Sequence, residues 1–306
     1  MIFLIILGIL VLLYFLVTLY FFYIAFVGRN ADNLENIDDI GNKPLWAYRD
    51  FIASGLDYIK TKDCERVYTK SFDGLKLSAR YFDNGFKKVI ILVHGYRSAA
   101  ARDFSCAVEM YTRLGFNILL VDQRCLGKSE GRLITFGVKE SRDLLSWINL
   151  VNEKYSPEKI VLGGMSMGAS TVLFANKYDL PDNVVGIIAD SGFTSPIEII
   201  NKVARQYFKI NASVFLPFLN VYCKIFGKFS LYDVSTVDAV KNSNLPILFI
   251  HGKDDSFVPC EMSISGYEAA KERSEILIID NADHGMGFLV EPENVFEKLK
   301  AFLAKV

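Results

Sequence analysis

The chain opens with a long apolar segment. No charged side chain occurs from Met1 to Gly28, and most of these positions are Ile, Leu, Val or Phe. As an α-helix rising about 1.5 Å per residue, the segment would extend about 40 Å, enough for a hydrocarbon layer of about 30 Å with some tilt. The pattern therefore predicts one transmembrane helix over residues 1–28.

A cleaved signal peptide is the alternative interpretation of this segment. Signal peptides begin with basic residues, contain about 7 to 15 apolar residues and end at a small-residue cleavage site. This segment has no basic start, is longer than that, and offers no A-x-A-like site before Arg29. We therefore expect an uncleaved, single-pass membrane anchor.

The sequence gives a direction for the orientation of this anchor. Arg29, Lys43 and Arg49 follow the span, although acidic residues are interspersed with them. Basic residues collect on the cytoplasmic side of transmembrane helices. Both this charge and the unpaired cysteines favour a location of the following domain on the cytoplasmic side.

The segment after the span is polar and then begins to fold. Residues 29–63 contain Gly41, Asn42 and Pro44, which break any early helix, so we predict a stalk that leads into a short helix over residues 45–60. Residues 67–71 and 75–82 flank an Asp-Gly turn, the pattern of a β-hairpin. We place the start of the soluble domain near Cys64, so that it covers residues 64–306.

The rest of the chain alternates between buried strands and helices. The apolar runs typical of strands are residues 89–93, 117–121, 160–163, 184–189, 247–250 and 276–279. The predicted helices are residues 103–114, 139–155, 167–178, 261–273 and 292–304. This order predicts an α/β fold, with a mostly parallel doubly wound sheet and ligands at the carboxyl ends of its strands. Residues 193–240 interrupt the alternation and predict a small helical cap.

Composition and charge narrow the function classes. With 306 residues, 51% of them hydrophobic and 23% charged, the chain can bury a large core. Lys and Arg number 34 against 35 Asp and Glu, so there is no basic footprint for nucleic acid. The five cysteines are an odd number without a CxxC pair, so we predict neither a disulfide scaffold nor a metal site, and no cofactor.

One pentapeptide carries a specific chemical signal. Gly164-Met165-Ser166-Met167-Gly168 lies between a predicted strand and a predicted helix, which is the context of a G-x-S-x-G nucleophile elbow. The glycines are needed because side chains there would collide with the neighbouring strand and helix. We therefore predict Ser166 as a nucleophile; the alternative is a tight structural turn with an idle serine.

A serine nucleophile needs a histidine base that a carboxylate orients. In the chain order serine, acid, histidine, the base follows Ser166, which leaves His251 and His284. His251 ends an apolar strand, so we assign it to packing. His284 lies on the loop after the last strand and precedes Gly285, so we predict it as the base.

The acid and the oxyanion donors are less narrowly determined by the residues. Asp254 and Asp255 both follow the penultimate strand, one loop from His284, and Asp190 is a third candidate. The strand over residues 89–93 leads into a His-Gly-Tyr loop, where we expect the backbone N–H of Tyr96 to act with that of Met167 as an oxyanion hole.

Together these motifs resemble the α/β-hydrolase family, over about residue 64 to the C-terminus. They are His94-Gly95-Tyr96, Asp122-Gln123-Arg124 with Gly127 to Gly131, the Ser166 elbow, His251-Gly252 through Val258-Pro259, and Asp283-His284-Gly285. The chain is most similar to the branch of monoglyceride lipases, lysophospholipases and serine-aminopeptidase-like enzymes, which includes bacterial members with an N-terminal membrane anchor.

The resemblance also selects the acid. The family pattern H-G-x-x-D-x-x-V-P puts the acid on Asp255, with Asp254 as the alternative. The chain departs from the family where Cys125 and Leu126 stand in place of the usual Gly and His, a change that we expect at the rim of the pocket.

The resemblance implies a membrane-anchored serine hydrolase with Ser166, His284 and Asp255 as its triad. We favour a small-molecule acyl ester or thioester as substrate over a peptide, because residues 193–230 contain only one acidic residue, Glu198, to hold an α-amine. Two interpretations of the cap stay open: two helices that only pack on the sheet, or a cap whose lysines and apolar residues face the lipid bilayer and which admits acyl chains. The alternatives are a serine peptidase, a C–C hydrolase or perhydrolase with the same triad, and an idle membrane-tethered scaffold. The sequence indicates no oligomeric state.

Overall fold

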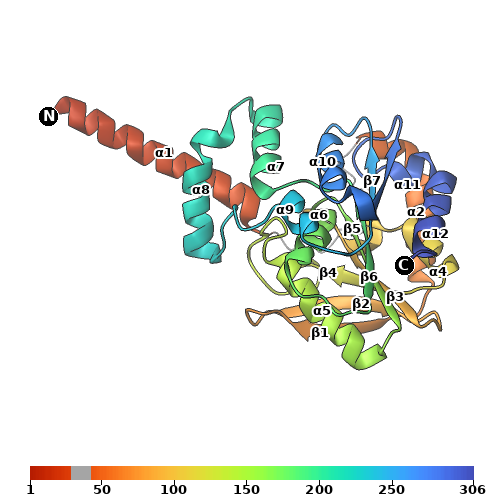
Figure 1. Ribbon diagram of the computed structural model, residues 1–306. Coiled ribbons are helices and arrows are strands. Elements are labelled where there is room, and N and C mark those ends of the chain that lie inside the picture. The colour runs from red at the N-terminus through yellow and green to blue at the C-terminus, as the bar shows by residue number, and fades with distance from the viewer. Residues whose placement is uncertain (29–42) are drawn as a thin grey trace.

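The computed structural model describes residues 1–28 and 43–306 and has one central sheet of eight strands (Figure 1). The strands are β1 (Glu65–Lys70), β2 (Lys76–Phe82), β3 (Lys88–Val93), β4 (Asn117–Asp122), β5 (Lys159–Met165), β6 (Val184–Asp190), β7 (Ile247–Gly252) and β8 (Ser274–Ile279). Their order in the sheet is β1-β2-β4-β3-β5-β6-β7-β8. β1 and β2 form the predicted hairpin, β2 is antiparallel to β4, and every later pairing is parallel. The predicted α/β fold class is confirmed.

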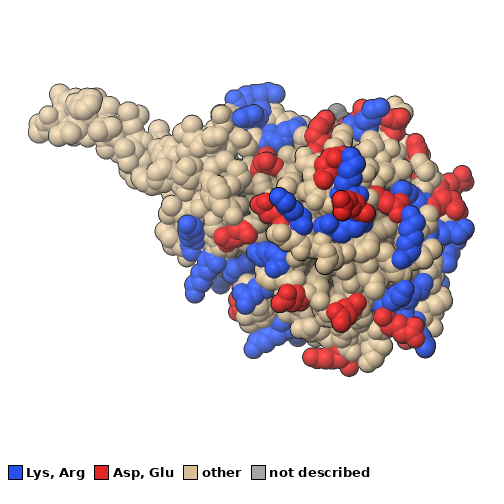
Figure 2. Space-filling model, viewed as in Figure 1, with Lys and Arg blue, Asp and Glu red and all other residues tan. Residues whose placement is uncertain are grey.

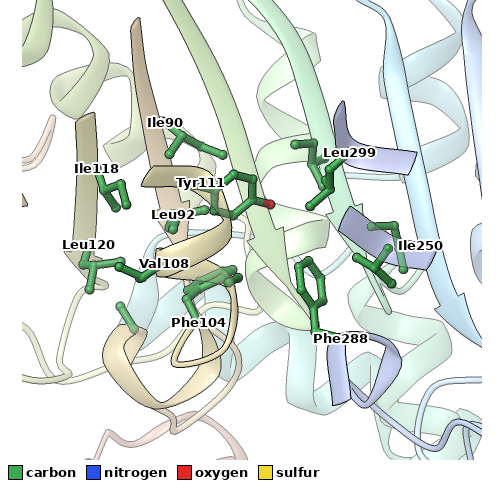
Figure 3. Close-up of a cluster of buried hydrophobic side chains, with 14 of the residues drawn as sticks. Ile90, Leu92, Phe104, Val108, Tyr111, Ile118, Leu120, Ile250, Phe288 and Leu299 are labelled. Carbon is green, nitrogen blue, oxygen red and sulfur yellow. The ribbon is translucent and has the colours of Figure 1, made fainter. Parts of the chain in front are cut away.

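Helices cover both faces of this sheet. One face packs against α2 (Arg49–Lys60), α4 (Ala107–Arg113) and α12 (Pro292–Leu303), and the other against α5 (Glu140–Tyr155), α6 (Met167–Phe174), α9 (Thr236–Lys241) and α10 (Glu261–Ala269). Figure 3 shows Ile90 and Leu92 of β3 beside Val108 of α4 on the first face. Val89 and Ile91 belong to the opposite cluster, as expected for successive side chains of a buried strand.

Two helices differ from their predicted form. The helix predicted over residues 103–114 is divided into α3 (Ala100–Asp103) and α4, with a break at residues 104–106. The helix predicted over residues 45–60 begins as a 3₁₀ turn (Lys43–Tyr48) and continues as α2, whose Ile52, Leu56 and Ile59 are buried in the sheet core. Residues 29–42 of the predicted stalk lie outside the described residues.

Residues 193–240 contain short helices that project from the sheet, where the cap was predicted. They are α7 (Pro196–Val203), a π-helical turn (Ala204–Phe208), a 3₁₀ turn (Ala212–Val214), α8 (Leu216–Tyr222) and a second π-helical turn (Cys223–Gly227), and these residues, 196–227, form the cap. α9, which follows, packs on the sheet instead.

The N-terminal segment is a single helix, α1 (Ile2–Phe26), which extends away from the sheet beside α8 (Figure 1). Its second half packs on the cap through aromatic rings. Tyr14 stacks on Phe215 with ring centroids 5.6 Å apart, and Phe22 lies 5.6 Å from Phe226. Within residues 1–28 and 43–306, α1 is the one helix long and apolar enough to cross a membrane.

A buried ion pair connects α5 with the turn between β1 and β2. The Arg124 guanidinium donates two hydrogen bonds of 2.7 Å to the carboxylate of Asp143 on α5, and contacts Asp73 of the hairpin turn at 3.1 Å. The side chains of Arg124 and Asp143 are only 4% and 6% exposed.

We expect Arg124→Ala to lower the free energy of unfolding by about 3–5 kcal/mol, because it leaves a buried carboxylate without its partner. Chemical denaturation of the full chain in detergent micelles measures this change. The control is Lys87→Ala, which removes an exposed ion pair with Glu158 and should leave stability as in the wild type. Equal stability of the two variants would contradict a structural role for Arg124.

Candidate active site

Ser166 lies on the sharp turn between β5 and α6. Its backbone has φ 55° and ψ −119°, a conformation that L-residues rarely adopt. A Cβ on Gly168 would lie 1.8 Å from the carbonyl oxygen of Val93, and one on Gly164 would lie 2.3 Å from that of Gly168. The two glycines are therefore required for the tight turn, as the sequence predicted.

The structure brings Ser166, His284 and Asp255 into one line of hydrogen bonds. Nε2 of His284 lies 2.9 Å from Oγ of Ser166, and Nδ1 of the same ring lies 2.7 Å from Oδ2 of Asp255. The other oxygen of Asp255 accepts hydrogen bonds from the backbone N–H groups of Phe257 and Val258. This geometry is that of a nucleophile, a base and an orienting acid.

The other candidate acids are placed differently. The side chain of Asp254 is exposed, and its backbone N–H donates a hydrogen bond to the carbonyl oxygen of Ala282. Asp190 is buried at the end of β6, and its carboxylate accepts a hydrogen bond from the hydroxyl of Ser191. Among the three carboxylates, only that of Asp255 contacts the imidazole of His284.

His251 is a site residue that the sequence analysis missed. It is fully buried at the end of β7, where packing was predicted. Its Nε2 also lies 3.1 Å from Oδ2 of Asp255, and its Nδ1 lies 2.7 Å from the hydroxyl of Ser263. Two imidazoles therefore converge on one oxygen of Asp255. The signal in the sequence that could have indicated this contact is that Asp255 follows His251 by four positions.

These contacts set the charge of the site. Burial alone would raise the pKa of Asp255, but the hydrogen bonds from His251 and His284 hold this pKa well below its usual range. Burial alone would lower the pKa of His284, but the hydrogen bond and the negative charge of Asp255 raise it above 6.5. Asp255 is therefore ionised at neutral pH, and it stabilises the protonated form of His284.

A second carboxylate supports the loop that follows β3. Oδ2 of Asp103 accepts a 2.7 Å hydrogen bond from the backbone N–H of Gly95, and its Oδ1 accepts one from the hydroxyl of Ser98. This loop carries Tyr96, and Met167 is the first residue of α6, where backbone N–H groups have no partner within the helix. The amides of Tyr96 and Met167 stay predictions as oxyanion donors.

Two cavities of about 280 Å³ each meet at Ser166. One of them, the mixed cavity, is lined by apolar residues and by the polar side chains of His284, Ser98, Arg102 and Asp103. The apolar cavity is lined by cap residues and by the end of α1, among them Phe21, Ile199, Val203, Phe208, Phe215 and Leu219. The site can therefore hold an apolar group on one side of the serine and a polar group on the other.

Cys125 and Leu126, expected at the rim of the pocket, line neither cavity. Both are buried in the same apolar cluster as Phe22 and Phe26 of α1. A Cβ on Gly28 would lie 2.6 Å from Sγ of Cys125, so the chain passes directly over this side chain. Cys125 and Leu126 therefore pack against the end of α1 and the residues that follow it.

Within the described part of the chain, no group of three or more His, Cys, Asp or Glu side chains could hold a metal ion.

Comparisons with known proteins agree with an α/β-hydrolase fold. Residues 85–240 match the family model described as serine aminopeptidase, S33. The chain is 26% identical to YqkD, an uncharacterised protein of Bacillus subtilis, over 70% of each chain, and 25% identical to a lysophosphatidylserine lipase of Danio rerio, over 65% of this chain and 52% of the lipase. A solved esterase of Pyrococcus furiosus is similar with a TM-score of 0.66 and 26% identity, over 81% of this chain and 94% of the esterase.

The raised pKa of His284 leads to a prediction about Ser166. Only neutral imidazole can accept the serine proton, and a raised pKa keeps the ring protonated to higher pH. The rate at which a fluorophosphonate labels Ser166 should therefore rise with pH, with a midpoint above about 6.5. In Asp255→Asn the charge that raises the pKa is lost, so the midpoint should move to lower pH and the rate should fall. The same midpoint in both proteins would rule out this coupling.

Proposed function

The chain belongs to the serine aminopeptidase S33 family of α/β-hydrolases, and from this premise we propose that it is a membrane-anchored serine hydrolase that cleaves carboxylic ester or thioester bonds of lipid-like acyl substrates. The observation that carries the proposal is the position of Ser166, hydrogen-bonded to His284 and placed between an apolar and a mixed cavity. An ester with a long acyl chain and a polar alcohol has the same two halves.

The mechanism follows from the hydrogen bonds. Oγ of Ser166 attacks the acyl carbonyl carbon while Nε2 of His284 accepts the hydroxyl proton, and Asp255 stabilises the imidazolium through Nδ1–H. The backbone N–H groups of Tyr96 and Met167 are the expected donors to the oxyanion. Nε2 then returns the proton to the leaving alcohol or thiol, which leaves an acyl-enzyme on Ser166. A water molecule, deprotonated by the same imidazole, then attacks the acyl carbon. The bond to Oγ of Ser166 breaks, Nε2 returns the proton to Oγ, and the carboxylic acid is released.

Charges near the site favour an ester over a peptide with a free amino terminus. Holding an α-ammonium group needs an available, ionised carboxylate, and Asp103 and Asp190 both line the mixed cavity. Both oxygens of Asp103 accept hydrogen bonds from the loop, and burial raises the pKa of Asp190 to about 6. Arg102 lines the same mixed cavity and would repel a cation. The similar lysophosphatidylserine lipase of Danio rerio is, by its name, a lipase, which supports a lipid-like substrate here.

The anchor is proposed to remain on the mature protein. The first half of α1 is exposed, but Phe22 and Phe26 are only 5% and 0% exposed. They are buried in the apolar cluster that also contains Cys125, Leu126 and side chains of the cap. Removal of α1 as a signal peptide would expose this cluster and open the apolar cavity. The packing therefore favours a retained helix over a cleaved one.

The position of the cap along α1 implies contact with the bilayer. Contacts with the cap begin at Tyr14, and residues 2–13 rise only about 18 Å as a helix, less than the hydrocarbon thickness of about 30 Å. If α1 spans the membrane, the cap beside Tyr14 reaches into the lipid. Its outward side chains suit that position, because Val214, Ile225 and Phe226 are 61%, 62% and 58% exposed.

Figure 2 shows the same distribution on the surface. α1 and the adjoining part of the cap present almost no charged atoms, and Lys and Arg side chains lie around the edge of this apolar area. Lys224 and Lys228 are the basic residues of the second π-helical turn of the cap and the position after it. Lysines at such an edge can reach anionic lipid headgroups while their neighbours enter the apolar layer.

We expect Ser166→Ala and His284→Ala each to lower the rate of ester hydrolysis by about 10⁴- to 10⁶-fold, since members of a triad act as a unit. Hydrolysis of a nitrophenyl ester by the full chain in detergent micelles measures this rate. Asp255→Asn should cost nearly as much, whereas Asp254→Asn, the matched change at the neighbouring exposed residue, should keep the wild-type rate. More than a tenth of the activity in Ser166→Ala would contradict the proposed nucleophile.

The membrane contact of the cap gives a separate prediction. In vesicles whose lipids carry bromine on the acyl chains, the added fluorescence of Phe226→Trp should be quenched, because this side chain would lie in lipid. Tyr68→Trp, at an exposed position on β1, is the matched control and should not be quenched. The signals of Trp46 and Trp147 are subtracted by measuring the wild type. If the fluorescence of Phe226→Trp is quenched no more than that of Tyr68→Trp, the side chain at position 226 lies in water and the proposed membrane contact is wrong.

A further inference from the structure

The end of α1 forms one wall of the apolar cavity. Phe21, Ile24 and Ala25 line it on one side, and Ser166 lines it on another. Phe21 packs edge-on against Phe208 of the cap, with ring centroids 5.4 Å apart. The segment expected to serve only as a membrane anchor therefore reaches the cavity that ends at the nucleophile.

The loop after β3 holds this end of α1 in place. The hydroxyl of Tyr96 donates a 2.7 Å hydrogen bond to the carbonyl oxygen of Ala25, and the Arg97 guanidinium donates to those of Ile24 and Val27 at 2.7 and 2.9 Å. The last carbonyls of a helix have no partner within the helix, and positive charge is favourable at that end. Tyr96 and Arg97 thus satisfy the helix end from the loop that also carries the expected oxyanion amide.

Further contacts fix the chain just beyond the helix. The backbone N–H of Ile134 donates to the carbonyl oxygen of Phe26, and that of Gly28 donates to Arg132, each at 2.8 Å. The ring of Phe26 is fully buried and lies 5.2 Å from the ring of Phe136. These contacts attach α1 to the catalytic domain independently of its contacts with the cap.

We propose that the end of α1 is part of the acyl-binding site, and that Phe21, Ile24 and Ala25 are specificity-determining residues that select the length of the fatty acyl chain. This inference rests on the proposed function, since it assigns the acyl chain of the substrate to the apolar cavity. It adds that the membrane helix itself contacts that chain.

The physical effect is burial of apolar surface. Each methylene that passes from water into an apolar cavity contributes enough free energy to raise kcat/KM about fourfold when the transition state retains the contact. A bulky side chain on the wall shortens the cavity and removes this gain for long chains first. A smaller side chain should extend the gain to longer chains.

The test uses the full chain in detergent micelles with nitrophenyl esters from butyrate to palmitate. Ala25→Phe should lower the ratio of kcat/KM for decanoate over butyrate by at least tenfold. Phe21→Ala should move the preferred chain length upward. The control Ile9→Phe adds a ring at an exposed position of the same helix, 59% exposed and outside the cavity, and should leave the ratio unchanged. An unchanged ratio in both cavity variants would overturn the proposal.

A second experiment avoids the risk that a variant fails to fold. The wild-type chain is treated with a decyl fluorophosphonate that carries a diazirine at the end of its alkyl chain. Oγ of Ser166 forms a bond to phosphorus, fluoride leaves, and His284 takes the proton. Light then releases nitrogen from the diazirine, and the resulting carbene inserts into a neighbouring side chain that peptide mapping identifies.

The outcomes separate this inference from the function on which it rests. Insertion into residues 21–25 supports the α1 wall. Labelling of Ser166 with insertion only into other segments overturns the wall and leaves the hydrolase assignment intact. Absence of labelling at Ser166 contradicts the proposed function itself, and the inference about α1 fails with it.

Discussion

The close approach of α6 to β3 is the constraint on which the site depends. The backbone of Gly168 lies so near the carbonyl of Val93 that any side chain there would collide with it. This contact fixes the turn that carries Ser166 and directs the N-terminus of α6 toward the loop after β3. Because that loop in turn holds the end of α1, the packing of one glycine links Ser166 to the N-terminal apolar helix.

Much of the fold could be predicted from the sequence because each central strand is a short apolar run, whereas α2, α5 and α12 are longer segments that mix apolar and charged residues. The order of strands and helices then gave the sheet. The elbow motif indicated Ser166, loop placement favoured His284 over His251, and only the family resemblance selected Asp255 over Asp254. The break at residues 104–106 could not be predicted, because its cause is distant in sequence. A Cβ on Gly55 of α2 would lie 2.3 Å from the carbonyl oxygen of Ser105, so α2 packs directly on this break.

The missed parts of the site share this dependence on distant contacts. From the sequence alone, His251 is a buried residue at a strand end. In the structure, Asp255 accepts hydrogen bonds from two imidazoles, those of His251 and His284. Asp103 reads as a helix residue until its carboxylate is seen to hold the loop of Gly95. Nothing in the apolar pattern of α1 distinguishes Ala25 from the residues that face lipid, because bilayer and cavity walls favour the same side chains.

That equivalence gives the arrangement its physical sense. The free energy of a fatty acyl chain changes little when the chain moves from the bilayer into a cavity with apolar walls. A chain that moves along α1 therefore need not be exposed to water on the way. Phe208 lines the cavity and is still 47% exposed, so the apolar lining continues to the surface beside Phe21. In the proposed acyl ester, the polar half would lie on the other side of Ser166, in the cavity lined by Arg102 and Ser98. If the proposal holds, the two products of cleavage leave toward different surroundings, the acid back along α1 and the polar alcohol toward water.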